Sequence, residues 1–260
     1  MIYLSELITA KVAARNAGKI LLKYYQDDKK NIQEKSKDNP VTDADFEADQ
    51  YIKNFLMGEF PFDGWLSEET VDDLIRLEKK RVWVVDPLDG TKEFIEQIPH
   101  FCVSIALVDN HIPVVGVIFN PVTDELFYAS KNSGAFKNQS RIFCSKEVDL
   151  KKSNIAVSRS EFQKGEWSAY QNNFSEISPI GSIAYKIAKV ADQSVDCFAT
   201  IAPKNEWDIC AADCIIHEAG GIMKTINSRT ILYNQKKTLV TDPIIASNSN
   251  MFNALSDLLY

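Results

Sequence analysis

Two carboxylates three residues apart lie at the end of an apolar run in Asp86-Pro87-Leu88-Asp89-Gly90-Thr91. The preceding residues, Val82-Trp83-Val84-Val85, are continuously apolar, which is typical of a strand covered on both faces. Pro87 and Gly90 predict that the chain turns directly after Asp86. Two desolvated acids are costly together unless a positive charge lies between them, and hard divalent cations prefer oxygen ligands. The sequence therefore predicts a metal site at this strand end.

Further acidic residues lie where helices or strands are expected to begin or end: Asp43 and Asp45, Glu68 and Glu69, and Asp208. Taken alone, the three aspartates suit the first turn of a helix, where acids cap the chain and complement the helix dipole. Glu68-Glu69 alone suits a surface loop. Asp86 has no such ordinary explanation, because its apolar strand leads it into the interior.

Other site types are excluded by spacing. An EF-hand loop beginning at Asp86 fails, because the next acid and the glycine fall at the wrong loop positions and a proline follows Asp86. His100, His111 and His217 lack metal-ligand spacing, and His217 is expected to pack or cap within a late helix. The sequence has no GxSxG elbow, Walker loop or GxGxxG fingerprint, which argues against a serine nucleophile or a dinucleotide site.

The elements that must position these acids can be predicted from periodicity. An N-terminal helix is expected with an apolar stripe formed by Leu4, Leu7, Ile8, Val12, Ile20 and Leu21. Residues 26–38 are expected to form a loop or short hairpin. A second helix should follow Thr42, with Phe46, Ile52, Phe55, Leu56 and Phe60 at three- and four-residue steps.

The remaining chain changes character twice. Residues 101–136 predict an antiparallel meander that begins with strands 101–108 and 113–119. Beyond residue 150, strands and helices alternate. Strands are expected at 154–157, 195–200 and 244–247, and helices near 160–172, 183–193, from 207 to Gly220-Gly221, and after an Asn248 or Ser249 cap. These patterns predict an α/β protein with an α+β domain over 1–150 packed against an α/β domain over 151–260.

Composition limits the partners. The chain has 260 residues, 45% of them hydrophobic, and a formal net charge of -7, which disfavours a nucleic-acid polymer as partner. Its five cysteines are odd in number and scattered, which favours reduced thiols in a cytoplasmic protein. No signal peptide and no membrane span are expected.

The separated motifs together resemble the inositol monophosphatase superfamily. They are Ser67-Glu68-Glu69, Asp86 to Thr91, Glu206-Trp207-Asp208 and His217-Glu218-Ala219-Gly220-Gly221. The resemblance implies a layered αβαβα sandwich of the inositol monophosphatase type. It also implies hydrolysis of small phosphate monoesters with two to three Mg²⁺ ions, lithium sensitivity and a possible homodimer.

The resemblance also implies roles for individual residues. Glu68, Asp86 and the carbonyl of Leu88 resemble the ligands of a first metal, and Asp86, Asp89 and Asp208 those of a second; Glu68 would help hold a third. Thr91 and Asp45 resemble the pair that orients the attacking water, with Glu68 nearby. Lys35 or Lys37 would fill the place of a lysine upstream of Asp45. The amides of Gly90 and Thr91 could hold phosphate oxygens.

Within the superfamily, Lys92-Glu93-Phe94 after Thr91 resembles the CysQ-type 3'(2'),5'-bisphosphate nucleotidases. Ser158-Arg159-Ser160, Gly181-Ser182 and Lys186 resemble substrate segments of that branch, to which Asp208 also contributes. Glu161 departs from a histidine that some relatives carry. The implied reaction is conversion of 3'-phosphoadenosine 5'-phosphate to AMP and phosphate. The alternatives are an inositol phosphatase or another small phosphate monoesterase, and a non-catalytic metal-binding protein.

Overall fold

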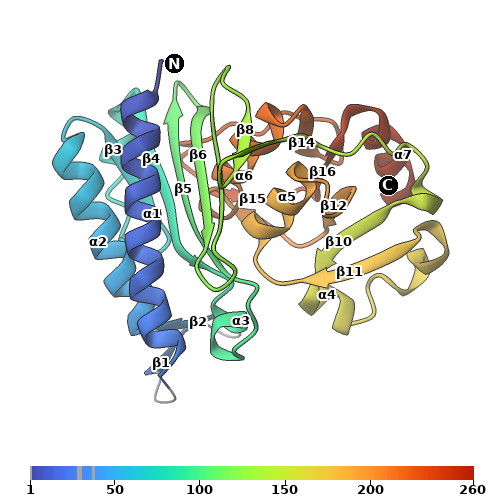
Figure 1. The fold of residues 1–260 in the computed structure, drawn as a ribbon, viewed down its shortest axis with the longest axis horizontal. Coiled ribbons are helices and arrows are strands. Elements are labelled where there is room, and N and C mark those ends of the chain that lie inside the picture. The colour runs from blue at the N-terminus through green and yellow to red at the C-terminus, as the bar shows by residue number, and fades with distance from the viewer. Residues whose placement is uncertain (1, 28–30, 37–38) are drawn as a thin grey trace.

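Two β-sheets alternate with three layers of helices, which confirms the expected αβαβα sandwich (Figure 1). The computed structural model describes residues 2–27, 31–36 and 39–260. The helices are α1 (Leu4–Tyr25), α2 (Asp43–Glu59), α3 (Thr91–Ile95), α4 (Arg159–Gln163), α5 (Ile183–Ala191), α6 (Glu206–Glu218) and α7 (Ser249–Leu259), with 3-10 helices η1 (Ile75–Glu78), η2 (Leu150–Lys152) and η3 (Ser168–Asn173).

The larger sheet has seven strands in chain order, and its members after the first form the expected antiparallel meander. Only the first pair within it is parallel. Its strands are β3 (Gly64–Ser67), β4 (Arg81–Asp89), β5 (Cys102–Asp109), β6 (Ile112–Asn120), β7 (Glu125–Ser130), β8 (Ala135–Lys137) and β9 (Ser140–Ile142).

The smaller sheet has the mixed order β11-β10-β12-β16-β14, parallel at the first two pairs and antiparallel at the last two. Two short antiparallel pairs, β1–β2 and β13–β15, complete the described strands. The bounds are β1 (Ile32–Ser36), β2 (Asn39–Thr42), β10 (Asn154–Ser158), β11 (Glu176–Ile180), β12 (Cys197–Thr200), β13 (Lys204–Asn205), β14 (Gly221–Thr225), β15 (Leu239–Val240) and β16 (Ile244–Asn248).

Helices cover both faces of each sheet. In Figure 1, α1 and α2 lie on the outer face of the larger sheet, α5 and α6 lie between the sheets, and α7 lies beyond the smaller sheet. Strand β4 explains why its sequence is continuously apolar: Val82 and Val84 enter the cluster around α5 and α6, whereas Trp83 and Val85 enter the cluster beneath α1 and α2. The predicted strand covered on both faces is confirmed.

Helix α1 buries only part of the apolar stripe expected of it. Leu4, Ile8 and Val12 are exposed, and the buried positions include Ala10, Ala13, Ala14 and Ala17. Leu7 and Leu21 of the predicted stripe are buried as expected, and much of the remaining buried face consists of small side chains, which allow α1 to approach the sheet closely. The Cα of Gly18 approaches so near that an added Cβ would lie 2.5 Å from the ring of Phe119. In α2, Phe46 is likewise exposed, although Ile52 and Leu56 are fully buried.

The helix expected over 160–172 is also wrong. The chain forms only the short α4 and then η3, because Gly165 adopts a left-handed φ of 78° and ends the helix. The predicted C-terminal end of α6 is confirmed, because Gly220 follows it with φ 84°. The predicted N-terminal cap of α7 is also confirmed, because the Asn248 side chain accepts hydrogen bonds from the backbone N–H groups of Asn250 and Met251.

The two halves share a continuous interior. Helix α6, which follows β12 in the chain, packs on β5 and β6 of the larger sheet, so it carries Asp208 across to the N-terminal half. The division at residue 150 stays a prediction. All five cysteines are buried and free, as expected for reduced thiols. None of the described helices is long and apolar enough to cross a membrane.

Candidate active site

A β-bulge brings the two acids of the opening motif to the same side of β4. The strand continues past Pro87, where the turn was expected to begin, and pairs with β5 as far as Asp89; the turn expected at Gly90 is present. Asp86 lies opposite Ser104 and Asp89 opposite Cys102, so three steps on β4 match two on β5. Residues three apart in a regular strand point to opposite faces, and the extra residue cancels that alternation. The backbone N–H of Leu88 donates to Asp86 Oδ1 at 2.9 Å within the bulge.

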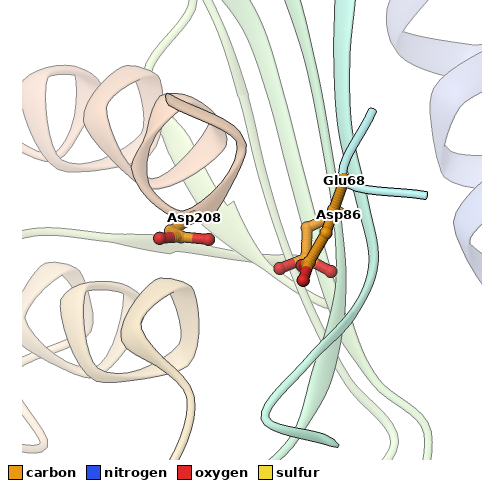
Figure 2. Close-up of side chains that lie close together, drawn as sticks. All are labelled: Glu68, Asp86 and Asp208. Atoms are coloured by element: carbon orange, nitrogen blue, oxygen red, sulfur yellow. The ribbon is translucent and has the colours of Figure 1, made fainter. Parts of the chain in front are cut away.

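Three carboxylates from three separate segments converge beside this bulge. Carboxylate oxygens of Glu68, Asp86 and Asp208 all lie within 4.8 Å of one another. Figure 2 shows Glu68 and Asp86 side by side, with Asp208 facing them from the first turn of α6. Glu68 follows β3, and its backbone N–H donates to the carbonyl of Val85, which extends the parallel pairing. The β3–β4 register therefore places Glu68 beside Asp86.

The electrostatics of this cluster suit a divalent cation. Burial raises the pKa of Asp86 well above its usual range, and the charges of Glu68, Asp89 and Asp208 raise it further. Burial likewise raises the pKa of Asp208, with Asp89 and Glu68 adding to the effect. Converging, desolvated carboxylate oxygens are the ligand set that Mg²⁺ prefers. The chemistry of the residues present therefore fits the metal.

Asp89 is not one of these three converging carboxylates, although its charge acts on them. Its Oδ2 accepts hydrogen bonds from Ser182 Oγ at 2.5 Å and from the backbone N–H of Ala184 at 2.7 Å, at the start of α5. Burial raises the pKa of Asp89, whereas the bond from Ser182 and the charge of Lys186 lower it. In this structure Ser182 thus acts on the site through Asp89. A direct contact between Ser182 and substrate stays a prediction.

Thr91 and Asp45, the pair implied by the family resemblance, are hydrogen-bonded to each other. Thr91 Oγ1 lies 3.2 Å from Asp45 Oδ1 and 3.2 Å from the carbonyl of Leu88. Asp45 Oδ2 also accepts the backbone N–H and the hydroxyl of Thr42, which closes a capping box at the start of α2. The helix-capping interpretation of Asp45 is therefore correct, and the same carboxylate also reaches Thr91.

Gly90 permits the tight path between the bulge and α3. It adopts a left-handed conformation with φ 102°, and an added Cβ would lie 2.8 Å from the carbonyl of His100. Only glycine meets both conditions without strain. Thr91 can therefore begin α3 directly beside the carboxylates.

A cavity of about 310 Å³ lies in front of these groups. All predicted site residues with described side chains line it except Asp45, which is hydrogen-bonded to the lining residue Thr91. Sequence reasoning did not assign Thr200 and Lys204, which also line the cavity. The position of Lys204 directly before Asn205 and the Glu206-Trp207-Asp208 motif was the signal that could have identified it. The predicted lining residues are Glu68, Asp86, Leu88, Asp89, Gly90, Thr91, Ser158, Gly181, Ser182, Lys186 and Asp208.

Two lysines place positive charge in the same cavity. Lys186 is buried and donates from Nζ to the carbonyl of Ile180 at 3.0 Å. Burial lowers the pKa of Lys186 to about 8; the nearby Asp89 charge opposes this shift and the charge of Lys204 adds to it. Lys204 also lowers the pKa of Asp208. The Lys204 ammonium therefore lies within electrostatic range of both groups.

Arg159 joins the two halves at the rim of this cavity. Its guanidinium forms ion pairs of 2.8 Å with Glu93 and with Glu96, both near α3. Gly181 lies against Glu93, since an added Cβ would come within 2.2 Å of Glu93 Cγ.

The sequence left two positions open, the lysine upstream of Asp45 and Glu161, and the structure describes the side chain of Glu161 only. The lysine upstream of Asp45 stays open, because Lys37 and the side chain of Lys35 lie outside the described part of the chain. Glu161 does not belong to the described residues that line the cavity, and its side chain points into the interior.

The model of the "Inositol monophosphatase family" matches residues 4–257. The chain belongs to this family. An "Inositol monophosphatase" of Dictyostelium discoideum is 34% identical, over 97% of this chain and 94% of that protein. The "3'(2'),5'-bisphosphate nucleotidase CysQ" of Haemophilus influenzae is 30% identical, over 92% and 91% respectively.

Solved structures of family members have the same architecture. The crystal structure of the "extragenic suppressor protein suhB" from Bartonella henselae superposes with a TM-score of 0.84 at 30% identity, and the match covers 98% of each chain. The predicted superfamily resemblance is thus confirmed. Family members are Mg²⁺-dependent phosphomonoesterases in general, which supports phosphatase chemistry for this acidic site.

Proposed function

We propose that this protein is a Mg²⁺-dependent phosphatase that hydrolyses the 3'(2')-phosphate of 3'-phosphoadenosine 5'-phosphate, giving AMP and phosphate. One observation carries the choice of substrate: the cavity that contains the acidic cluster also contains the Lys186–Lys204 pair. The acidic cluster, with metal bound, suits the phosphate that is cleaved. Two like charges that share a cavity are relieved by an anion between them, and the second phosphate of this substrate supplies one.

The metal would be held by residues already described. Glu68, Asp86, Asp89, Asp208 and the carbonyl of Leu88 would supply oxygen ligands for two to three ions, and the convergence of Glu68, Asp86 and Asp208 supports this. Mg²⁺ held by these residues would neutralise phosphoryl oxygens, lower the pKa of a coordinated water and stabilise the leaving oxygen.

The chain itself orients the attacking water. Because the Thr91 hydroxyl can donate to Asp45, its oxygen lone pair is available to accept a hydrogen bond from a water in the cavity. Asp45 is in turn fixed by two bonds from Thr42, so the carboxylate cannot rotate away. Proton transfer through Thr91 to Asp45 then leaves the water oxygen more nucleophilic.

A second candidate is hydrolysis of inositol phosphates. Its support is the Dictyostelium relative, which bears that name and shows somewhat higher identity than the CysQ relative. An inositol monophosphate has a single phosphate, so it would bring no second anionic group to the lysine pair. The geometry therefore favours the bisphosphorylated nucleotide.

The test is phosphate release from 3'-phosphoadenosine 5'-phosphate and from inositol 1-phosphate, assayed in parallel with and without Mg²⁺ and Li⁺. We expect Mg²⁺-dependent release, with kcat/KM at least about tenfold higher for the nucleotide, and inhibition by Li⁺. Preference for inositol 1-phosphate would refute the proposed substrate. Tight Mg²⁺ binding without turnover of any phosphate monoester would favour the non-catalytic alternative.

A further inference from the structure

Glu161 is a buried carboxylate that connects α4 to the segment after β12. Its side chain is 4% exposed, and its two oxygens face different parts of the chain. Oε2 accepts a hydrogen bond from Trp167 Nε1 at 3.1 Å. Oε1 accepts from Thr200 Oγ1 at 2.6 Å and from the backbone N–H groups of Ile201 and Ala202 at 3.3 and 3.2 Å.

Such a carboxylate strongly restrains the segment that it binds. Burying a charge is costly unless polar partners replace the lost water, and here N–H and O–H donors supply that compensation. Removing the acceptor would leave the N–H groups of Ile201 and Ala202 without this partner. The segment 200–202 therefore has a strong preference for the observed conformation.

The restrained segment leads directly into the active site. Thr200 lines the cavity, and so does Lys204, only two residues beyond Ala202. The next residue, Asn205, caps α6, and its backbone N–H donates to Asp208 Oδ2 at 2.8 Å. Lys204 pairs with Val240 of β15 and the capping box anchors Asn205, so a displacement of residues 200–202 would reach Lys204 through the one connecting residue, Pro203.

We propose that Glu161 is a positioning residue for substrate specificity: it holds segment 200–202 so that Lys204 faces the second anionic group of the substrate. This inference rests on the proposed function in one respect, namely that the second group is a phosphate. Glu161 itself contacts no substrate. Its effect is transmitted through the backbone to Lys204.

The test compares Glu161→Gln and Lys204→Met on two substrates that differ in one group. 3'-Phosphoadenosine 5'-phosphate has a 5'-phosphate, whereas adenosine 3'-phosphate lacks it. Glutamine preserves shape but removes the charge and turns an NH₂ donor toward other donors. For each variant we expect KM for the bisphosphate to rise about tenfold, with KM for the monophosphate changed less than about twofold and kcat nearly constant.

Two further variants separate positioning from general stability. Trp167→Phe removes the bond to Oε2 and leaves those of segment 200–202, so it should lower the melting temperature without changing the ratio of the two KM values. The double variant Glu161→Gln/Lys204→Met should raise that ratio no more than Lys204→Met alone, because both changes disrupt the same contact, that of Lys204 with the second anionic group of the substrate. If Glu161→Gln does not fold, Thr200→Val serves instead, with the same sign and an increase of about two- to threefold.

Equal increases in KM for both substrates, or multiplying effects in the double variant, would overturn the proposal. A wild-type protein that hydrolyses inositol 1-phosphate but neither nucleotide would refute the proposed function and the phosphate part of this inference. The positioning part is decided separately by amide hydrogen exchange. Glu161→Gln should accelerate exchange at Ile201 and Ala202 at least about tenfold over wild type, and unchanged exchange there contradicts it.

Discussion

At the scale of single residues, Asp89 has an electrostatic role and a hydrogen-bonding role, and most substitutions would remove both at once. It contributes negative charge to the acidic cluster, and it accepts two hydrogen bonds at the start of α5. An asparagine retains a carbonyl oxygen for those bonds but loses the charge. Asp89→Asn is therefore the substitution that separates chemistry from structure.

We expect Asp89→Asn to reduce Mg²⁺-dependent phosphate release by about 10³-fold or more while the circular dichroism spectrum stays that of the wild type. Asp124→Asn is the matched control, because it makes the same chemical change at an exposed carboxylate. Asp124 forms an ion pair with Arg15 and belongs to none of the site motifs. Retained activity in Asp89→Asn would exclude Asp89 as a metal ligand. Loss of the fold would assign it a structural role.

His217 shows a residue-scale effect that depends on pH. Its Nδ1 lies 2.7 Å from Asp213 Oδ1, and the hydrogen bond to Asp213 raises the pKa of His217 from 6.5 to about 9. The ion pair therefore contributes stability fully below pH 6.5, and that stability is lost as the pH rises through about 9. The expectation that His217 packs rather than catalyses agrees with this contact.

His217→Gln should lower the free energy of unfolding by roughly 1 kcal/mol at pH 6, since solvent screens a half-exposed pair. The difference from wild type should vanish near pH 10. Urea unfolding at both pH values measures it, with phosphate release as the control for an unchanged site. An equal difference at both pH values would show that the charge of His217 contributes nothing.

At the scale of elements, the contact between α6 and β6 decides where Asp208 lies. Gly116 of β6 faces α6 so closely that an added Cβ would lie 2.3 Å from the backbone carbonyl of Ala211. Backbone cannot yield as a flexible side chain can. A larger residue at 116 must therefore push α6, and Asp208 with it, away from Glu68 and Asp86.

Gly116→Ala should destabilise the protein by about 2–3 kcal/mol and raise the Mg²⁺ concentration needed for half-maximal activity several-fold. Gly58→Ala is the matched control: it lies in α2 with no atom within 4 Å of the new Cβ, and it should stabilise slightly. Thermal unfolding and Mg²⁺ titration of both variants provide the measurement. A neutral Gly116→Ala would mean that α6 has room to adjust.

At the scale of the whole molecule, the converging carboxylates of the site lower the stability of the metal-free fold. Glu68 and Asp86 come from the N-terminal part of the chain and Asp208 from α6, so folding itself brings these charges together. Burial and mutual repulsion raise the pKa of Asp86, which means that its ionised form is disfavoured in the folded state. Metal binding should relieve this repulsion.

Metal-free Asp86→Asn should therefore be more stable than metal-free wild type at pH 7, by about 1–2 kcal/mol. Addition of Mg²⁺ at 100 times its dissociation constant should stabilise wild type by about 2.7 kcal/mol and leave the variant nearly unchanged. Differential scanning calorimetry with EDTA and with Mg²⁺ tests both expectations. A wild type that Mg²⁺ does not stabilise would contradict the metal assignment.

The sequence by itself determined the apolar strand before Asp86, the meander, the helix caps and the order of the acidic motifs. These features depend on neighbouring residues, so local chemistry is enough to predict them. Among the site residues, local chemistry alone indicated Asp86 and Asp89, whereas Glu68, Thr91 and Asp208 were identified through the family resemblance of their short motifs. Their convergence was implied by family resemblance rather than by any pattern in the chain.

Only the tertiary structure decided which way side chains point. The bulge that aligns Asp86 with Asp89 depends on β5, the alanine face of α1 depends on close approach to the sheet, and the inward Glu161 depends on the segment after β12. Periodicity reports which positions share a face but not which partner packs against that face. Long-range packing supplies that information, and with it the place of Lys204 in the cavity.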